Sequence, residues 1–252
     1  MSNLSRRKLI TTGLAATAGA SGLVVAANLA HRYGLIPPDH GGIYGAGETL
    51  TYGAQRLLTR HSLAREFPRS QISTKPVANG ETPQDEAFKR LHAGGFTDWR
   101  LAIDGLVARP ASFSLAELKS YPSRSQITHL ACEEGWSFIA EWIGVPLSHV
   151  LTVVGILPKA RYVVYSSMQR GWWDSVDMAD ASHPQTLVTY GMNGGELPVG
   201  HGGPIRLRVP RQLGYKNVKY IKRLTVTDNL NRFGQGLGSA SPEAGYAWYA
   251  GI

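Results

Sequence analysis

Short runs in which apolar and polar residues alternate dominate the chain from about residue 99 onwards. Val, Ile, Tyr and Thr are frequent in these runs, and an alternation with period two is typical of half-buried β-strands. The runs that predict strands are Trp99–Ile103, Gln126–Cys132, Tyr162–Ser166, Thr186–Tyr190, Pro204–Val209 and Val218–Thr227. Asn193-Gly194 supplies the chemistry of a tight turn.

Two short helices are predicted between these runs. Leu115–Ser120 is preceded by Ser114 with Glu117 three residues later, the pattern of a capping box, and Leu147–Val154 is followed by the stop signal Gly155. A third helix is possible at Gly53–Phe67. No internal repeat is present, so the fold class expected is α+β, a mixed-sheet domain with many short strands and loops long enough to hold a ligand.

The first 35 residues differ from the rest of the chain. Arg6, Arg7 and Lys8 precede an uncharged stretch from Thr11 to Ala30, which is the order of a twin-arginine export signal. The alternative is a buried N-terminal helix. Because no clean Ala-x-Ala cleavage site follows, the leader could stay attached as a membrane tether. We therefore expect an exported, periplasmic protein with a leader at 1–35, an arm at 36–95 and the main domain at 96–252.

Composition sharpens this picture in two ways. The 252 residues are 43% hydrophobic, enough for a sizeable core, and carry a net charge of +8, half of which lies in the leader. No basic stripe with interleaved aromatic residues is visible, so we expect no nucleic-acid partner. Cys132 is the one cysteine of the chain, which excludes an internal disulfide, a multi-cysteine zinc site and covalent attachment of a c-type haem.

Cys132 ends a predicted strand, just before Glu133-Glu134-Gly135-Trp136. A lone cysteine is most often a small buried apolar residue. The alternative is a thiolate that acts as a metal ligand or a nucleophile. His129 is a poor candidate for its base, because an odd offset along a strand places the two side chains on opposite faces.

A second candidate site lies around His201, where Gly200-His201-Gly202-Gly203 precedes the predicted strand that carries Arg206 and Arg208. The two arginines are two residues apart and so share one face of that strand. They could form the polar outer face of a half-buried strand. They could instead bind an anion, because guanidinium groups beside glycine-rich turns suit a phosphate.

The ordered set of motifs in both segments resembles the sulfite oxidase superfamily, molybdenum enzymes with a pterin dithiolene cofactor. The resemblance covers about half of the chain, from Trp99 to Asp228. It rests on Cys132-x-x-x-Trp136-Ser137, Trp142-Ile143-Gly144-Val145-Pro146-Leu147, His183-Pro184-x-x-Leu187, Met192-Asn193-Gly194, Leu197-Pro198, His201-Gly202-x-Pro204-x-Arg206-Leu207-x-Val209-Pro210 and Gly214-x-x-x-Val218-Lys219.

The resemblance implies a molybdenum-molybdopterin cofactor with Cys132 as the protein thiolate on the metal. It implies two-electron oxygen-atom transfer at that metal, and, by analogy with exported bacterial relatives, a pterin without a nucleotide. The residues that it implies for the pterin and its phosphate are Ser167, His201, Arg206, Asn217, Val218 and Lys219, with Arg69 and Gln71 as weaker candidates.

Departures from the superfamily pattern bear on the substrate. Sulfite oxidases follow the ligand cysteine with Ala-Gly-Asn-Arg, whereas this chain has two carboxylates and Trp136 there, a poor surround for a sulfite dianion. The Cys-x-Glu-x-Trp-Ser form is similar to the exported branch that includes the periplasmic protein-methionine-sulfoxide reductases. We therefore expect reduction of sulfoxide-like substrates, with sulfite oxidation and a non-catalytic pterin-binding module as alternatives.

The same resemblance leaves the source of electrons outside the chain. Because a c-type haem cannot be attached, it implies a separate redox partner, either a membrane haem subunit or a soluble cytochrome. Trp172 and Trp173 could line the entrance to the metal, or could simply anchor a loop.

Overall fold

The structure is a computed structural model that describes residue 30 and residues 34–252. The predicted export signal falls almost wholly outside the described residues. In the described part, no helix is both long and apolar enough to cross a membrane.

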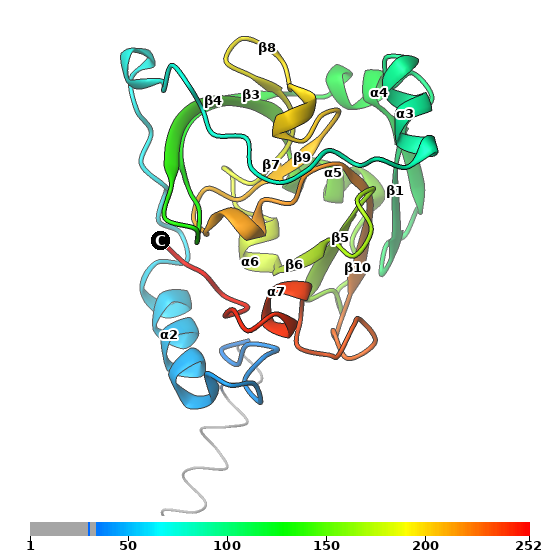
Figure 1. Ribbon diagram of the computed structural model, residues 1–252. Helices are drawn as coiled ribbons and strands as arrows, with labels where there is room; N and C mark the ends of the chain where they lie inside the picture. The colour runs from blue at the N-terminus through cyan, green and yellow to red at the C-terminus, as the bar shows by residue number, and fades with distance from the viewer. Residues whose placement is uncertain (1–29, 31–33) are drawn as a thin grey trace, which may run out of the picture.

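Two five-stranded sheets form the body of the molecule (Figure 1). The first has the strand order β2-β1-β10-β5-β6; β1 and β10 are parallel and the other neighbours are antiparallel. Its strands are β1 (Arg100–Gly105), β2 (Ala111–Ser114), β5 (Tyr162–Ser167), β6 (Trp173–Asp177) and β10 (Ile221–Thr227).

The second sheet is antiparallel throughout, in the order β3-β4-β7-β8, with β9 also paired to β7. Its strands are β3 (Arg124–Ala131), β4 (Ser137–Pro146), β7 (Leu187–Met192), β8 (Gly195–Glu196) and β9 (Arg206–Arg208). Side chains from both sheets meet in one apolar core, for example Leu101 and Val226 with Val145 and Leu207. This two-layer packing confirms the α+β class.

The helices are short and lie around the sheets. They are α2 (Gly45–Leu58), η1 (Arg69–Gln71), α3 (Glu86–Ala93), α4 (Leu115–Ser120), α5 (Leu147–Val154), α6 (Met178–Ala181), η2 (Val199–His201), η3 (Gly214–Lys216) and α7 (Ala240–Glu243). Both firmly predicted helices, α4 and α5, have the predicted bounds. Ser114 and Glu117 form a full capping box, and Gly155 ends α5 in the left-handed conformation, with φ 69°.

The helix predicted at Gly53–Phe67 is wrong in its bounds. Helix α2 begins earlier and ends at Leu58, and its buried face is formed by Glu48, Tyr52 and Arg56. Polar residues at helical spacing give no apolar stripe, so the pattern of hydrophobic residues did not reveal the first half of the helix. After α2 the chain is extended, and the Phe67 amide donates to the Ile127 carbonyl at 2.9 Å.

Several strands also differ from the prediction. β4 and β6 lack an alternating pattern because both of their faces are largely buried. β10 begins at Ile221 rather than Val218, since Tyr220 has a φ of +56° and interrupts the extended backbone. β9 is limited to Arg206–Arg208.

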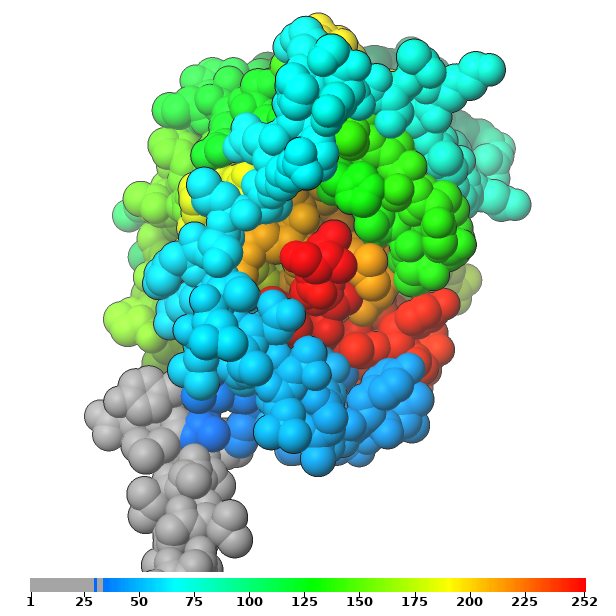
Figure 2. Space-filling model, turned by 90° about the vertical axis from the view of Figure 1, so that its left-hand side faces the viewer, coloured from blue at the N-terminus to red at the C-terminus, as the bar shows by residue number. Residues whose placement is uncertain are grey.

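The arm that follows α2 runs over the body to α3 (Figures 1 and 2). It is attached to β3 through Phe67 and to β4 through Ser73, whose amide donates to the Ile139 carbonyl at 2.9 Å. Farther along, the Asn79 carbonyl accepts a hydrogen bond from Lys219 Nζ at 2.5 Å. The arm therefore brings residues that are far from Cys132 and Lys219 in sequence to one edge of the candidate site.

A prediction about the fold concerns Gly144, which lies in β4 where the pairing with β7 shifts register. A Cβ atom at this position would lie 2.3 Å from the Val188 carbonyl oxygen. We expect Gly144→Ala to lower the free energy of unfolding by about 3 kcal/mol, measured by urea denaturation, because the two strands must separate. Gly195→Ala in β8, whose added Cβ would meet nothing closer than 3.9 Å, is the matched control; an equal loss there would contradict the prediction.

Candidate cofactor site

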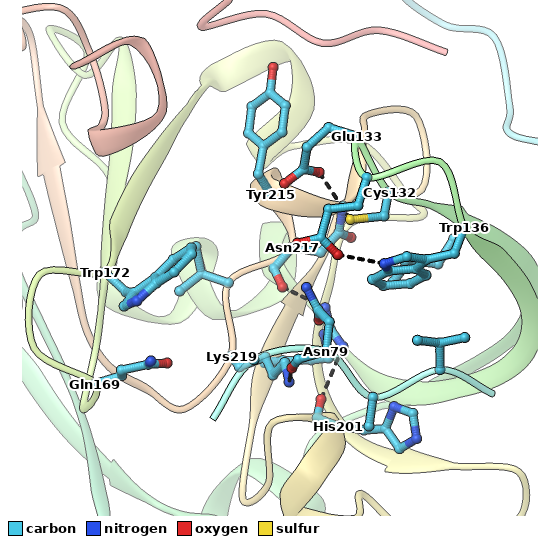
Figure 3. Close-up of a pocket in the computed structure, with 18 of the residues that line it drawn as sticks. Asn79, Cys132, Glu133, Trp136, Gln169, Trp172, His201, Tyr215, Asn217 and Lys219 are labelled. Atoms are coloured by element: carbon cyan, nitrogen blue, oxygen red, sulfur yellow. Dashed lines mark hydrogen bonds between the residues drawn. The ribbon is translucent and has the colours of Figure 1, made fainter. Parts of the chain in front are cut away.

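A pocket of about 770 Å³, counting the part open to solvent, lies at the end of β3 (Figure 3). Segments that are distant in sequence form its wall: the arm at 77–81, the turn after β3, the end of β5 and the chain from η3 to β10. Seven of the predicted site residues line it, namely Cys132, Ser167, His201, Arg206, Asn217, Val218 and Lys219.

Cys132 is held in a tight turn at the pocket wall. Its amide donates to the Trp136 carbonyl at 2.9 Å and its carbonyl accepts from Gly135 at 3.1 Å. Gly135 has a φ of +90°, a conformation that favours glycine. The Cα of Cys132 rests against Gly214, where an added Cβ would lie only 3.2 Å away. The position of the sulfur is therefore fixed by the backbone on two sides.

The thiol of Cys132 is protonated in the protein alone. Burial, together with Glu133 and Glu134, raises its pKa to about 11, and Sγ donates to Glu133 Oε2 at 3.2 Å. A thiol in such surroundings is a weak nucleophile. A bound metal cation reverses this, because coordination requires the thiolate and supplies the compensating charge. His129 does not line the pocket.

Arg206 is a buried cation with no carboxylate partner among the residues that the structure describes. Its guanidinium donates to the carbonyls of His201 at 3.0 Å and Asn217 at 2.6 Å, while its buried Nε has no partner. Burial lowers its pKa to about 10. Since an uncompensated buried charge is costly, this guanidinium indicates a site for an anion.

Two more basic groups lie beside Arg206. Lys219 Nζ donates to the carbonyls of Asn79 and Gly200, at 2.5 and 2.7 Å. Burial and Arg206 lower the pKa of Lys219 to about 8, and burial, Arg206 and Lys219 lower that of His201 to about 4. His201 is therefore neutral at physiological pH, and the positive charge of this side of the pocket is carried by Arg206 and Lys219.

Two other buried cations, Arg56 and Lys216, have carboxylate partners. Lys216 Nζ lies 2.6 Å from Asp174 Oδ1, with both side chains 1% exposed, and Arg56 pairs with Asp177 and Asp180. Among the buried arginine and lysine side chains of the described residues, Arg206 and Arg208 lack such a partner. Of these two, Arg206 lines the pocket with the half-buried Lys219, and this pattern fits a bound phosphate there.

One alternative expected Arg206 and Arg208 to form the polar outer face of a half-buried strand. The structure shows that this expectation is wrong. Both are buried, and their guanidinium carbons lie 5.3 Å from the ring centroid of Trp142. Arg208 does not line the pocket: it donates to Asn217 Oδ1 at 2.8 Å and to the His129 carbonyl at 2.5 Å. It positions the Asn217 loop from behind.

The remaining predicted residues divide into two groups. Ser167 Oγ donates to the Lys219 carbonyl at 2.8 Å, and Asn217 Oδ1 is already occupied by Arg208 and the Val209 amide. These contacts tie together the pocket wall that also contains Val218. Arg69 and Gln71 lie on η1 in the arm, outside the pocket, and Arg69 forms an ion pair with Glu141 at 2.6 Å.

Sequence reasoning did not assign several residues of the pocket. Arm residues 77–81 line it, although nothing in their sequence indicates a ligand. Trp136 stacks on Phe138 with ring centroids 6.1 Å apart, and both face the pocket. Trp172 lines the pocket and is 54% exposed, as one alternative expected, whereas its neighbour Trp173 belongs to β6.

Negative and positive groups lie on different sides of Cys132. In Figure 3, Glu133 and Tyr215 lie on one side of the thiol, and Lys219 and His201 on the other. Trp136 Nε1 donates to Glu134 Oε2 at 2.6 Å, which fixes the second carboxylate near the mouth. One side of the pocket therefore suits an anionic cofactor, while the other presents a soft metal ligand.

Comparisons with known proteins agree with this geometry. Residues 89–232 match the oxidoreductase molybdopterin binding domain. The chain is 37% identical over 195 residues to the “Putative protein-methionine-sulfoxide reductase subunit YedZ1” of Azospira oryzae, covering 77% of this chain and 70% of that protein. It is 33% identical to the protein-methionine-sulfoxide reductase catalytic subunit MsrP of Ralstonia nicotianae, covering 52% of this chain and 44% of that one.

The fold is similar to that of a solved structure, the sulfane dehydrogenase SoxCD from Paracoccus pantotrophus. The TM-score is 0.52 at 22% identity, over 68% of this chain and 46% of that one. At this identity the similarity concerns the fold alone. The family match covers more than half of the chain and includes the whole cation-lined wall of the pocket. This protein therefore belongs to the molybdopterin-binding oxidoreductases of the sulfite oxidase superfamily.

Proposed function

We propose that this enzyme reduces sulfoxides, with methionine sulfoxide as the reference substrate, in the cell envelope. The balanced reaction is R₂SO + 2e⁻ + 2H⁺ → R₂S + H₂O. The observation that carries the proposal is the lining of the pocket, where Glu133, Glu134 and the indoles of Trp136 and Trp172 accompany Cys132. Carboxylates repel a sulfite dianion, and apolar rings suit a neutral sulfoxide.

The cofactor and the residues of the pocket would have different roles in the reaction. When bound, the molybdenum-pterin cofactor supplies two-electron oxygen-atom transfer. Cys132 would hold the metal, and Arg206 and Lys219 would bind the phosphate of the pterin. Glu133 Oε2 accepts the hydrogen bond of the thiol and is therefore placed to take the proton that Sγ loses when it ligates the metal. The proposed pterin carries no nucleotide, which is supported by the resemblance to exported relatives alone.

Export and electron supply complete the proposal. Arg6, Arg7 and the uncharged stretch that follows support transport by the twin-arginine pathway in the folded, cofactor-loaded state. A single cysteine excludes covalent c-type haem, which supports a separate redox partner such as a membrane haem subunit or a soluble cytochrome.

A pair of assays tests the substrate. Protein from a host that makes the cofactor should reduce methionine sulfoxide with a reduced viologen dye as electron donor, and should turn over sulfite with an artificial acceptor far more slowly. Molybdenum is measured in the same samples by elemental analysis. Sulfite turnover without sulfoxide reduction would favour the oxidase alternative, and folded protein that never contains molybdenum would favour the non-catalytic one.

A pH prediction follows from Lys219. In the protein without bound cofactor its pKa is lowered to about 8, whereas a phosphate beside the ammonium raises it. The free protein loses this proton above about pH 8, so pterin affinity should be highest below that pH and fall as the pH rises. We expect less pterin to survive gel filtration at about pH 9, where Arg206 is still charged, than at about pH 7. Lys219→Arg should abolish this difference because guanidinium stays charged; an unchanged profile would contradict the assignment.

A further inference from the structure

Helix α2 presents an apolar face that no part of the described protein covers. Leu50, Leu57 and Leu58 are 73%, 70% and 82% exposed, and Ile43 and Leu63 on either side of the helix are also exposed. Half of the exposed large apolar residues of the described protein fall between residues 43 and 63. Such a concentration marks an interaction surface rather than chance exposure.

Exposed charges in this region are of one sign. The carboxylates of Asp39 and Glu48 are buried, where they accept from the backbone amides of Trp248 and Tyr249. Arg60 and Arg65 are exposed just after the helix. From residue 34 to residue 65 the described surface therefore has basic groups and no exposed carboxylate, and the exposed Glu66 that follows is paired with Arg124.

The polar face of α2 is attached firmly to the body. Tyr52 Oη donates to Asp177 Oδ2 at 2.6 Å, and Arg56 forms ion pairs with Asp177 and Asp180. The exposed leucines therefore occupy a fixed surface at one end of the molecule, where α2 lies in Figures 1 and 2. A rigid helix that shows leucines on one side and is flanked by arginines has the pattern of an interfacial helix.

The chain itself indicates what covers this face. The uncharged stretch from Thr11 ends at Ala30, whose carbonyl accepts from the Leu35 amide at 2.8 Å. The Leu35 carbonyl in turn lies 3.6 Å from where a Cβ on Gly53 of α2 would be. The end of the stretch thus lies beside α2, so any membrane that receives residues 11–30 is brought to this helix.

We propose that α2 docks on the surface of an anionic lipid bilayer, with its leucines in the interface and Arg60 and Arg65 at the headgroups. This inference goes beyond sulfoxide reduction and does not depend on it. Docking would hold the enzyme at the membrane whether or not the leader is cleaved. It would also place the pocket at a set height above the bilayer.

The test uses the full chain and vesicles of phosphatidylcholine with phosphatidylglycerol. We expect the triple variant Leu50→Ser, Leu57→Ser, Leu58→Ser to bind these vesicles at least about 10-fold more weakly than the unmodified protein. Ile156→Ser with Leu157→Ser, exposed apolar residues away from α2, is the matched control. Equal binding of triple variant and parent would overturn the proposal. Pterin content and dye-linked activity report on folding, because none of these residues lines the pocket.

A depth measurement separates docking of α2 from anchoring by the leader alone. Leu58→Trp in the full chain should show added fluorescence that brominated lipids quench, whereas Ile156→Trp should not. Absence of quenching at position 58 in vesicle-bound protein would overturn the proposal. Sedimentation without lipid addresses a second copy as the occupant: a dimer that the triple variant loses would assign the face to self-association instead.

Discussion

Cys132→Ser should leave the fold and the bound pterin largely in place and lower sulfoxide turnover by at least about 1000-fold, since changing groups that merely support metal ligands already costs 10 to 100-fold. A hydroxyl fills nearly the same space as the thiol. However, it is a hard and far less acidic donor that does not replace the soft, strongly donating thiolate as a metal ligand. The backbone of the turn, held by Trp136 and Gly135, does not depend on the sulfur.

The measurement is the dye-linked kcat together with the pterin and molybdenum contents of the same sample. Ala131→Ser is the matched control, because it adds a hydroxyl one position earlier, on the other face of β3. If Cys132→Ser keeps more than about a tenth of the activity per bound molybdenum, the thiolate is not the metal ligand that the argument requires.

Local chemistry made part of the fold predictable. The capping box at Ser114 and the left-handed Gly155 fix helix ends through nearby backbone groups, so α4 and α5 were predicted to the residue. In contrast, β4 is buried on both faces and its sequence does not alternate. The buried face of α2 is polar because Tyr52 and Arg56 bond to carboxylates far along the chain. Tertiary pairing decides such elements, and a local pattern does not contain it.

The candidate site, like the fold, was predictable only in part. Cys132, Arg206 and Lys219 were identified because motifs in fixed order carry them, and the structure brings them to one pocket. The uncompensated charge of Arg206 could not be seen in the sequence, where two arginines on one strand face are equally compatible with a solvated surface. Arm residues 77–81 reach the pocket through contacts of the arm with β3, β4 and Lys219, which no local signal indicates.

Arg206→Met should yield folded protein with about a tenth or less of the normal pterin content. The reason is that the buried guanidinium has no carboxylate partner in the described protein and would bind the phosphate of the pterin. Arg223→Met removes a guanidinium that is exposed and paired with Asp104, and should keep the cofactor. Lys216→Met provides the opposite control. This change leaves the buried Asp174 carboxylate without its ion-pair partner, so it should lower the free energy of unfolding by about 3 to 5 kcal/mol whether or not pterin is bound.

Thermal unfolding with and without bound pterin distinguishes loss of the cofactor from loss of stability. If Arg206→Met lost stability as Lys216→Met does, yet retained its pterin, Arg206 would be a structural cation and the phosphate would have to be bound elsewhere in the pocket.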